Sequence, residues 1–413
     1  MCVHVNNEIG QIKEVLVQKP RENTLDYYDG NLTQIFSLRA NFNAQAATEE
    51  HLNYRRILEK ENIAISYVDE LLVETLNAQP SARDELIHNY AIESGAKGAE
   101  MLSAIEDTLK SIESNDELVA ALLRGMSYSD SHLLDFEENS LASACGDLLN
   151  PSSLFVNPLS TMWFTRDPLA IIGNGITLHH MYLPERNREV SLYQTIFKYH
   201  PQYACSDTYY SHDSSYYIEG GDVLNLTSEA VIFGISQRTE AAAIDVIACN
   251  LLWNPHTTIN EIYAIRVPEE GHRIHLDTYL TQVDYDKFLV DPALTINSEV
   301  YKITRGNQRN TVVVSSLFDS LQTILSKALK IPSVQFIECG DGIGRIAERE
   351  GQGNAISALC LKPGRLCVYE HNKITNRALE KAGIDLIPIE INELTSGFGG
   401  PNCLSLPLCR EDI

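Results

Sequence analysis

One of the nine cysteines, Cys403, lies near the end of the chain in a loop too rich in glycine for a helix or a plain strand: Gly397-Phe398-Gly399-Gly400-Pro401-Asn402-Cys403-Leu404-Ser405-Leu406-Pro407. Glycine lets a backbone adopt positive φ and approach a ligand closely, and the two prolines stiffen the loop. The thiol would therefore be held in place, which suits a catalytic nucleophile. A cysteine in such a turn is more often an ordinary buried residue, so the case depends on the other side chains of the chain.

Three further clusters place acids or histidines at the predicted ends of strands: Phe164-Thr165-Arg166-Asp167-Pro168, Glu219-Gly220-Gly221-Asp222 and His272-Arg273-Ile274-His275-Leu276-Asp277. By itself, Asp before Pro is a turn signal. Two glycines between acids indicate a bulge or turn, although they also permit close approach of a ligand. His275 and Asp277 would face the same side of an extended segment, because strand side chains alternate between the two faces.

The third cluster leaves two alternatives open. His272, His275 and Asp277 could coordinate a metal. This is the weaker interpretation, since no other His-rich or Cys-rich cluster completes a set of ligands. His275 could also be a core histidine that is bonded to a neighbour.

Taken together, the clusters supply a thiol, a histidine and at least three carboxylates. A thiol with a histidine is typical of cysteine proteases and amidases, but several acids are a poor lining for a neutral peptide carbonyl. Carboxylates bind planar guanidinium cations bidentately. The carbon of such a cation reacts with a nucleophile if its charge is held and the leaving nitrogen is protonated. The residue types therefore favour chemistry on a guanidinium group.

The elements that must position these residues follow an α/β rhythm. A strand is predicted within 5–19, then a helix within 44–60 and a strand at 63–68. Between 71 and 149 the strand signals vanish and apolar residues recur at helical spacing. Capping-box patterns at 81–84 and 114–117 would begin helices there. After 150, strands and helices alternate again to the end of the chain, among them a strand at 170–178 with an internal turn at 173–175 and a helix at 317–329. The sequence thus predicts an α/β body of residues 1–70 and 150–413, interrupted by an all-helical domain at 71–149.

Composition limits the function further. The formal net charge of −24 argues against nucleic acid or an anionic membrane as a partner. No apolar run approaches the roughly 20 residues that span a bilayer, and the N-terminus lacks the pattern of a secretory signal, so we expect a cytoplasmic protein. Nine cysteines without a CxxC pair argue against a disulfide framework and against a thiolate zinc site.

The four motifs, in this order along the chain, resemble those of the arginine deiminases. The resemblance also takes in residues 9–17, 172–175 and 347–354, and so covers nearly the whole chain. It implies the pentein fold, a five-bladed α/β propeller, with a helical domain inserted where the helical stretch is predicted. It also implies a small guanidinium substrate, L-arginine. The sequence leaves the oligomeric state open, and a homo-oligomer is compatible with it.

The resemblance implies a role for each residue of the motifs. Cys403 matches the nucleophile that attacks the guanidinium carbon, releases ammonia and forms a covalent thiouronium. Asp167 and Asp277 match the carboxylates that hold the guanidinium nitrogens. His275 matches the general acid and base, with Glu219 assisting its orientation and proton transfer. Hydrolysis of the intermediate would yield L-citrulline, without a metal or an organic cofactor.

The residues that would bind the rest of the substrate match the family only in part. Arg186 and Arg238 correspond to arginines that hold the substrate carboxylate, and Phe164 and Asn402 fall at substrate-binding positions. Asn402 stands where the family often has a third arginine, and Thr161 replaces an asparagine. Two alternatives to arginine hydrolysis therefore follow: hydrolysis of another guanidine, such as agmatine or a modified arginine, or a non-catalytic binding protein on the same fold.

Overall fold

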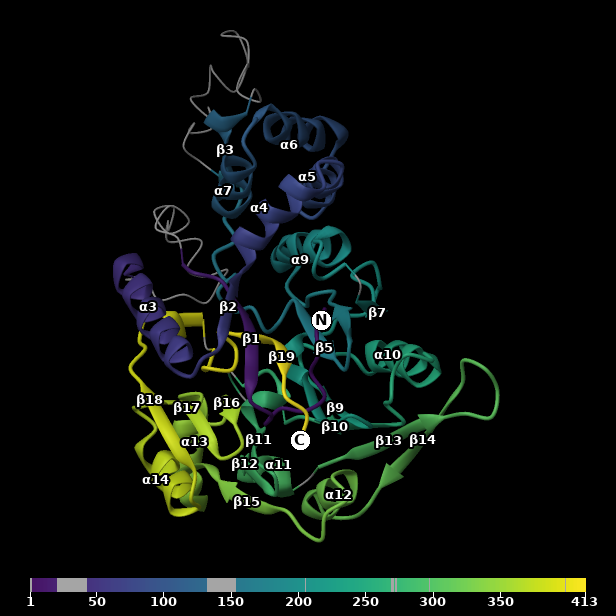
Figure 1. The fold of residues 1–413 in the computed structure, drawn as a ribbon, viewed down its shortest axis with the longest axis vertical. Helices are drawn as coiled ribbons and strands as arrows, with labels where there is room; N and C mark the ends of the chain where they lie inside the picture. Colours follow the sequence, from purple (N-terminus) through teal and green to yellow (C-terminus); the bar gives the residue numbers. More distant parts are fainter. Residues whose placement is uncertain are drawn as a thin grey trace, which may run out of the picture.

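The computed structural model of the protein describes residues 2–20, 43–131, 154–204, 206–268, 271, 273–296, 298–397 and 399–413. His272, Phe398 and the end of the predicted helical stretch at 132–149 lie outside these residues. The described chain forms a mixed α/β body with a group of helices at one end (Figure 1).

Five sheets of the described chain share one order of elements. In each, two antiparallel strands are followed by a helix and by a third strand that runs parallel to the second. In chain order from the first complete unit they are β5 (Leu169–Ile172), β6 (Gly175–Leu178), α9 (Asn187–Tyr199) and β7 (Asp207–Tyr210); β8 (Val223–Thr227), β9 (Ala230–Ile235), α10 (Ala241–Trp253) and β10 (Glu261–Arg266); β11 (Leu280–Asp284), β12 (Lys287–Val290), α12 (Leu321–Ala328) and β15 (Gln335–Glu338); β16 (Leu359–Lys362), β17 (Arg365–Tyr369), α14 (Lys373–Lys381) and β18 (Asp385–Ile389); and β19 (Leu406–Arg410), β1 (Ile12–Val17), α3 (Ala44–Lys60) and β2 (Ala64–Tyr67).

Further elements connect or extend these units. Two strands, β13 (Val300–Arg305) and β14 (Val312–Leu317), extend the sheet of β8, β9 and β10 beyond β10. Two helices, α11 (Pro292–Ile296) and α13 (Gly344–Gln352), lie in the connections before and after β15. The predicted strand at 170–178 is confirmed as two strands, β5 and β6, that turn at Gly173, whose φ of 60° suits glycine.

The fifth unit joins the two ends of the chain. β19 pairs antiparallel with β1, and β1 pairs parallel with β2. Figure 1 shows the yellow β19 beside the purple β1. Arg410, the last residue of β19, is buried and donates hydrogen bonds of 2.8 Å to the carbonyl oxygens of Gly10 and Cys360. The strand that follows Cys403 is therefore fixed by the first strand of the protein.

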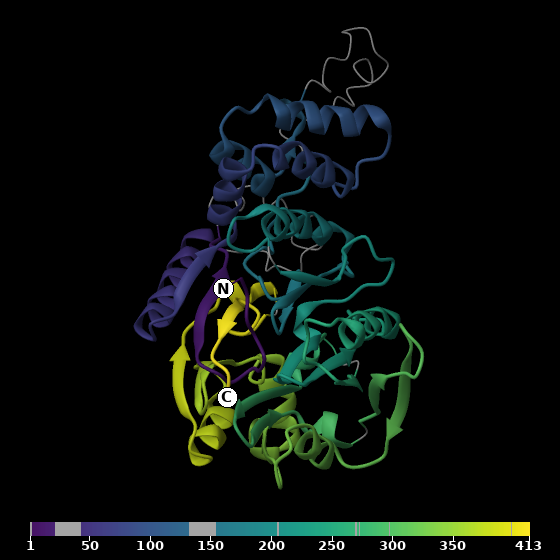
Figure 2. The ribbon, with the colours of Figure 1, turned by 45° about the vertical axis from the view of Figure 1, so that its right-hand side comes forward.

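The helices predicted after residue 71 are present as α4 (Val68–Ala78), α5 (Ala82–Ile92), α6 (Ala99–Ser111) and α7 (Asn115–Arg124). Figures 1 and 2 show them at one end of the molecule, beyond α9. Of the two predicted caps, that of α7 forms, because Ser114 accepts a hydrogen bond from the backbone N–H of Glu117. The other was wrong in its contact, because α5 begins after Ser81 without a side-chain capping bond. The stretch also contains a two-residue strand, β3 (Met126–Ser127), which pairs with β4 (Leu154–Val156). In the described part of the chain, no helix is long and apolar enough to cross a membrane.

The cysteines differ from expectation at one position. The sequence argues against a disulfide framework, yet Cys2 is disulfide-bonded. The other six described cysteines, Cys403 among them, are free. A count of cysteines cannot reveal a single bond of this kind, since bonding depends on which residues the fold brings together.

Candidate active site

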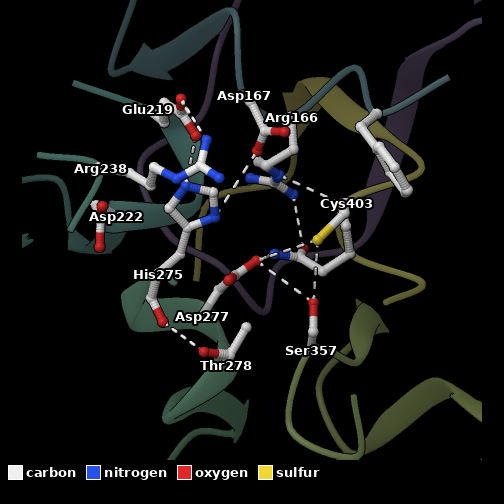
Figure 3. A network of polar contacts seen from close by, with 12 residues as sticks. Arg166, Asp167, Glu219, Asp222, Arg238, His275, Asp277, Thr278, Ser357 and Cys403 are labelled. Carbon is white, nitrogen blue, oxygen red and sulfur yellow. Dashed lines mark hydrogen bonds and ion pairs between the residues drawn. The ribbon is translucent and has the colours of Figure 1, made fainter. Parts of the chain in front are cut away.

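The five predicted catalytic residues lie in one buried cluster (Figure 3). Cys403 is 7% exposed, and the other four are less exposed still. Cys403 Sγ lies 3.8 Å from Asp277 Oδ2. His275 Nε2 is 2.8 Å from Glu219 Oε2, and its Nδ1 is 4.0 Å from Asp167 Oδ1. Side chains from four separate parts of the sequence therefore meet at one point.

The pair of His275 and Glu219 is a buried ion pair. Burial disfavours the charged imidazole, but the hydrogen bond to Glu219 and the charges of Asp222 and Asp167 outweigh it and raise the pKa of His275 to about 9. Burial acts against ionised Glu219 as well, yet the hydrogen bond from His275 and the charge of Arg238 lower its pKa to about 2. At neutral pH the site therefore holds an imidazolium beside a carboxylate.

The two glycines between Glu219 and Asp222 allow other parts of the protein to come close. A Cβ atom on Gly221 would lie 2.6 Å from Nδ1 of His275, and one on Gly220 would overlap the backbone carbonyl of Arg166. The close approach that the motif predicts for a ligand is made here by protein groups. Glycine at 221 leaves the room in which the imidazole lies.

Asp277 is the centre of the contacts around the thiol. It lies in the short 3-10 helix η5 (Leu276–Thr278). Its Oδ2 accepts a hydrogen bond from Asn402 Nδ2 at 2.9 Å and lies 3.4 Å from Ser357 Oγ. Burial raises the pKa of Asp277, while His275 and Asn402 act against this rise.

Two carboxylate oxygens in the cluster have no hydrogen-bond donor among the described residues. They are Oδ1 of Asp167 and Oδ1 of Asp277, and both are buried. A buried acceptor without a donor is costly, because it has lost its hydration without a replacement. A planar cation with several N–H donors would satisfy both oxygens.

The thiol of Cys403 lies in an acidic environment. Burial raises its pKa well above the usual value, and the charges of Asp277 and Asp167 add to the rise. Free Cys403 is therefore a neutral thiol at neutral pH. A cation bound between the two carboxylates would offset these charges and favour the thiolate.

Arg186, a predicted substrate-binding residue, is largely engaged by the protein. Its Nη1 donates to Asp167 Oδ2 at 2.7 Å, its Nε and Nη2 donate to Glu189, and Nη2 also donates to the carbonyl of Phe164. Thr161 donates to the same Glu189 at 2.8 Å. A guanidinium has five N–H groups, and these contacts take four. Binding of a substrate carboxylate by Arg186 stays a prediction that must rely on the remaining N–H or on an exchange of contacts.

Arg238 makes fewer hydrogen bonds to the protein through its guanidinium than Arg186 does. Its Nη1 lies 3.4 Å from Glu219 Oε1, its guanidinium lies 5.0 Å from the ring centroid of Tyr182, and its buried Nε has no partner among the described residues. Figure 3 shows its guanidinium beside His275. Phe164, the other predicted binding residue, packs so closely on Gly399 that a Cβ there would overlap its ring.

Two residues of the cluster were not assigned a role from the sequence. Arg166 donates to Asn402 Oδ1 at 2.8 Å and so holds the asparagine that contacts Asp277. Ser357 Oγ lies 3.4 Å from Cys403 Sγ. Arg166 stands inside a recognised motif, next to Asp167, and could have been found from that position. Ser357 lies just before β16 in a segment without any motif, so no local signal marks it.

A metal was the weaker prediction from the sequence, and its proposed ligand His272 lies outside the described residues. A different trio, Asp167, Glu219 and His275, brings its ligand atoms within 4.8 Å of one another. Two of these atoms, Nε2 of His275 and Oε2 of Glu219, are already hydrogen-bonded to each other. A site without a metal stays a prediction.

The geometry defines a class of site: a buried thiol beside a histidine and carboxylates that suit a small planar cation, on a mixed α/β fold. Solved structures share this fold. An amidinotransferase from Microseira wollei in a saxitoxin biosynthetic pathway matches with a TM-score of 0.54 and 14% identity, over 100% of this chain and 98% of that chain. DDAH from Pseudomonas aeruginosa, complexed with citrulline, matches with a TM-score of 0.51 and 11% identity, over 96% and 99%. At these identities the likeness shows the pentein-type fold alone.

The sequence comparisons are more specific. The family model for arginine deiminase matches residues 38–410. An arginine deiminase of Treponema denticola is 33% identical over 412 residues, and one of Clostridium perfringens is 35% identical over 420 residues. Each match covers 100% of this chain and 99% of the relative. The chain belongs to the arginine deiminase family.

Proposed function

We propose that this protein hydrolyses L-arginine to L-citrulline and ammonia through a covalent thiouronium intermediate on Cys403. The observation that carries the proposal is that one buried carboxylate oxygen of Asp167 and one of Asp277, beside a buried thiol, have no hydrogen-bond donor among the described residues. Membership of the arginine deiminase family supports the choice of arginine.

In the first half of the reaction, the guanidinium of the substrate binds between Asp167 and Asp277. Its charge offsets the two charges that raise the pKa of Cys403, so the thiol releases its proton to bulk water as the substrate binds. Sγ then attacks the guanidinium carbon and forms a C–S bond. His275, protonated because its pKa is about 9, gives its proton to the leaving nitrogen. The C–N bond breaks, ammonia departs and the thiouronium remains.

In the second half, the neutral His275 accepts a proton from water as the water oxygen attacks the thiouronium carbon. Collapse of this adduct breaks the C–S bond and returns the electron pair to Sγ. The proton of the added hydroxyl passes to this thiolate, which restores the thiol and leaves the ureido group of citrulline. Glu219 keeps its hydrogen bond to His275 and stabilises the imidazolium in each half.

At the other end of the substrate, we assign the carboxylate to Arg238 and Arg186, with Phe164 and Asn402 lining the site. One observation favours a second candidate substrate. Arg186 already donates four hydrogen bonds to protein acceptors, two of them to Glu189. A guanidine without a carboxylate, such as agmatine, would leave this cluster undisturbed.

We also infer that the five units surround the site as a five-bladed propeller formed by residues 1–70 and 150–413, with residues 71–149 as an inserted helical domain. The common order of strands in the five sheets and the position of α4 to α7 at one end support this. A cytoplasmic protein without a nucleic-acid or membrane partner fits the net charge of −24.

One assay tests the function. Wild type and Cys403→Ala are incubated with arginine, agmatine and methylated arginines, and ammonia and ureido products are measured. We expect turnover of arginine by the wild type, with the highest kcat/KM of the set, and none by Cys403→Ala. A higher kcat/KM for agmatine would show that agmatine, and not arginine, is the preferred substrate. If the wild type turns over no guanidine, the result would support the non-catalytic binding protein.

A further inference from the structure

Ser357 places a hydroxyl beside the sulfur of the proposed nucleophile. Its Oγ lies 3.4 Å from Cys403 Sγ, and the residue is fully buried. In the described part of the chain, Ser357 and Asp277 are the residues whose side-chain polar atoms lie within hydrogen-bonding distance of this sulfur. Asp277 is a carboxylate, so of these two side chains only the serine hydroxyl can donate to a thiolate. A backbone hydrogen bond from Gly400 also acts to lower the pKa of Cys403.

The hydroxyl has one proton and two acceptors within reach. The second acceptor is Asp277 Oδ2, also at 3.4 Å. That oxygen already accepts from Asn402 at 2.9 Å. A rotation about the Cβ–Oγ bond of Ser357 turns its proton from the carboxylate to the sulfur and leaves Asp277 with one donor on Oδ2.

The backbone around Ser357 fixes this position. The carbonyl oxygen of Ser357 accepts a hydrogen bond from the N–H of Asn402 at 3.1 Å. On the same side, a Cβ on Gly400 would lie 2.6 Å from Ser357 Oγ. The serine and the loop of Cys403 are thus in direct contact through both main chain and side chain, and the hydroxyl moves with the sulfur.

We propose that Ser357 is a catalytic residue whose hydroxyl donates a hydrogen bond to the Cys403 thiolate. The proposal rests on the proposed role of Cys403 as nucleophile. The physical need arises from the acidic surroundings of the sulfur, because Asp277 and Asp167 both disfavour a negative charge there. A donor that can turn to Sγ offsets part of this effect without adding a fixed positive charge that would repel the guanidinium.

The hydroxyl would act twice in the cycle. It faces the thiolate when substrate binding removes the thiol proton. It faces the thiolate again when the C–S bond breaks and the electron pair returns to Sγ, since a stabilised thiolate is a better leaving group. Loss of the hydroxyl should therefore lower kcat more than it changes KM.

The test is the reactivity of the free thiol against pH. Substrate-free wild type and Ser357→Ala are treated with iodoacetamide, and alkylation of the peptide that contains Cys403 is followed by mass spectrometry. We expect the pH midpoint of alkylation to rise by about 1 unit in Ser357→Ala, because one hydrogen bond to a charged group contributes on this order. We also expect kcat for arginine to fall roughly tenfold, which corresponds to about 1.4 kcal/mol.

Two further variants separate the hydroxyl from the packing. Ser357→Thr keeps the hydroxyl and should keep the wild-type midpoint. Ser405→Ala removes another buried hydroxyl of the same loop, one that contacts Tyr54 Oη at 3.1 Å, and should leave the midpoint unchanged. Thermal unfolding checks that each variant is folded, and Ser357→Gly replaces the alanine variant if that one unfolds.

The proposal is overturned if Ser357→Ala or Ser357→Gly titrates like the wild type, or if Ser405→Ala shifts the midpoint as much as Ser357→Ala does. Both results can be obtained whether or not the wild type turns over arginine, because alkylation needs no substrate. Failure of the proposed function would show itself separately, as turnover that persists in Cys403→Ala or as absent turnover in the wild type.

Discussion

The imidazolium of His275 depends on a small number of neighbours. Burial alone would make this histidine neutral, as it does for His179, whose pKa burial lowers to about 4. The two histidines differ in their partners, since His275 is bonded to a carboxylate and His179 to a backbone carbonyl and a threonine. A hydrogen bond to an acid, together with the nearby carboxylate charges, thus distinguishes the histidine that can serve as the proton donor.

The substitution Glu219→Gln tests this dependence. The amide removes the negative charge and weakens the charge-assisted hydrogen bond that raise the pKa of His275, so the pKa should fall from about 9 toward its usual value or below. His275 is protonated below its pKa, so the fall of kcat on the alkaline side should move to lower pH. The imidazole chemical shift, followed by NMR against pH, measures the change directly.

Glu299→Gln is the matched control for this prediction. Glu299 is exposed and pairs with Arg266 on the surface, so its loss should leave the titration of His275 unaltered. An unshifted His275 in Glu219→Gln would mean that other charges maintain the imidazolium.

Among single residues of the site, the sequence predicted those whose side-chain type and spacing form a recognisable motif. Cys403, His275 and the three carboxylates stand in short motifs, and the structure places them together. Ser357 is an unremarkable serine in sequence. Its contact with the sulfur exists only because the segment before β16 meets the loop of the nucleophile, and no local pattern encodes such a meeting.

Among the elements, the turns that carry the site depend on residues without a side chain. The turn from Glu219 to Asp222 packs against the imidazole of His275 at Gly221. The loop before Cys403 packs against Ser357 at Gly400. Gly221 and Gly400 are needed at these crossings for space, and neither has a positive φ. The strands can bring their ends this close only because the turns occupy so little volume.

Gly221→Ala should therefore damage the site. The added Cβ would lie 2.6 Å from His275 Nδ1, so the imidazole must shift from its present position. We expect kcat to fall by about 100-fold, since a displacement of about 1 Å in a catalytic group has costs on this order. Steady-state kinetics measures the loss. Gly344→Ala is the control, because a Cβ there meets no atom within 4 Å; an equal loss of activity in both would contradict the account.

The sequence predicted the helices and strands whose hydrophobic spacing can be recognised within a single short segment. The strand at 63–68, the paired strands at 170–178 and the helices after residue 71 all appear. The helix predicted at 317–329 is shorter, because β14 continues to Leu317 and α12 begins at Leu321 behind its cap Ser320. The pairing of β19 with β1 joins residues almost 400 positions apart and has no local signal at all.

At the scale of the whole molecule, the pairing of β19 with β1 is supported by a buried polar contact of Arg410. Arg410 is fully buried, and burial lowers the pKa of its guanidinium. It donates to Gly10 and Cys360, which belong to different units of the fold. One side chain thus satisfies carbonyl oxygens of two different segments of the chain.

Arg410→Met should destabilise the closed fold. Methionine approximates the volume of the side chain but leaves the carbonyls of Gly10 and Cys360 without their donor, which costs about 1–3 kcal/mol. The free energy of unfolding in urea measures this, and Arg377→Met, at an exposed position of α14, should change it little. Equal stability of the Arg410 variant and the wild type would show that the contact is dispensable.

The place of Cys403 in the order of elements also bears on when the site can form. Every other described strand precedes β19 in the sequence, so β19 can dock on β1 only after those strands have been made. Pairing over such a sequence separation slows folding. A chain that stops before residue 403 therefore carries the carboxylates and the histidine of the site without its nucleophile.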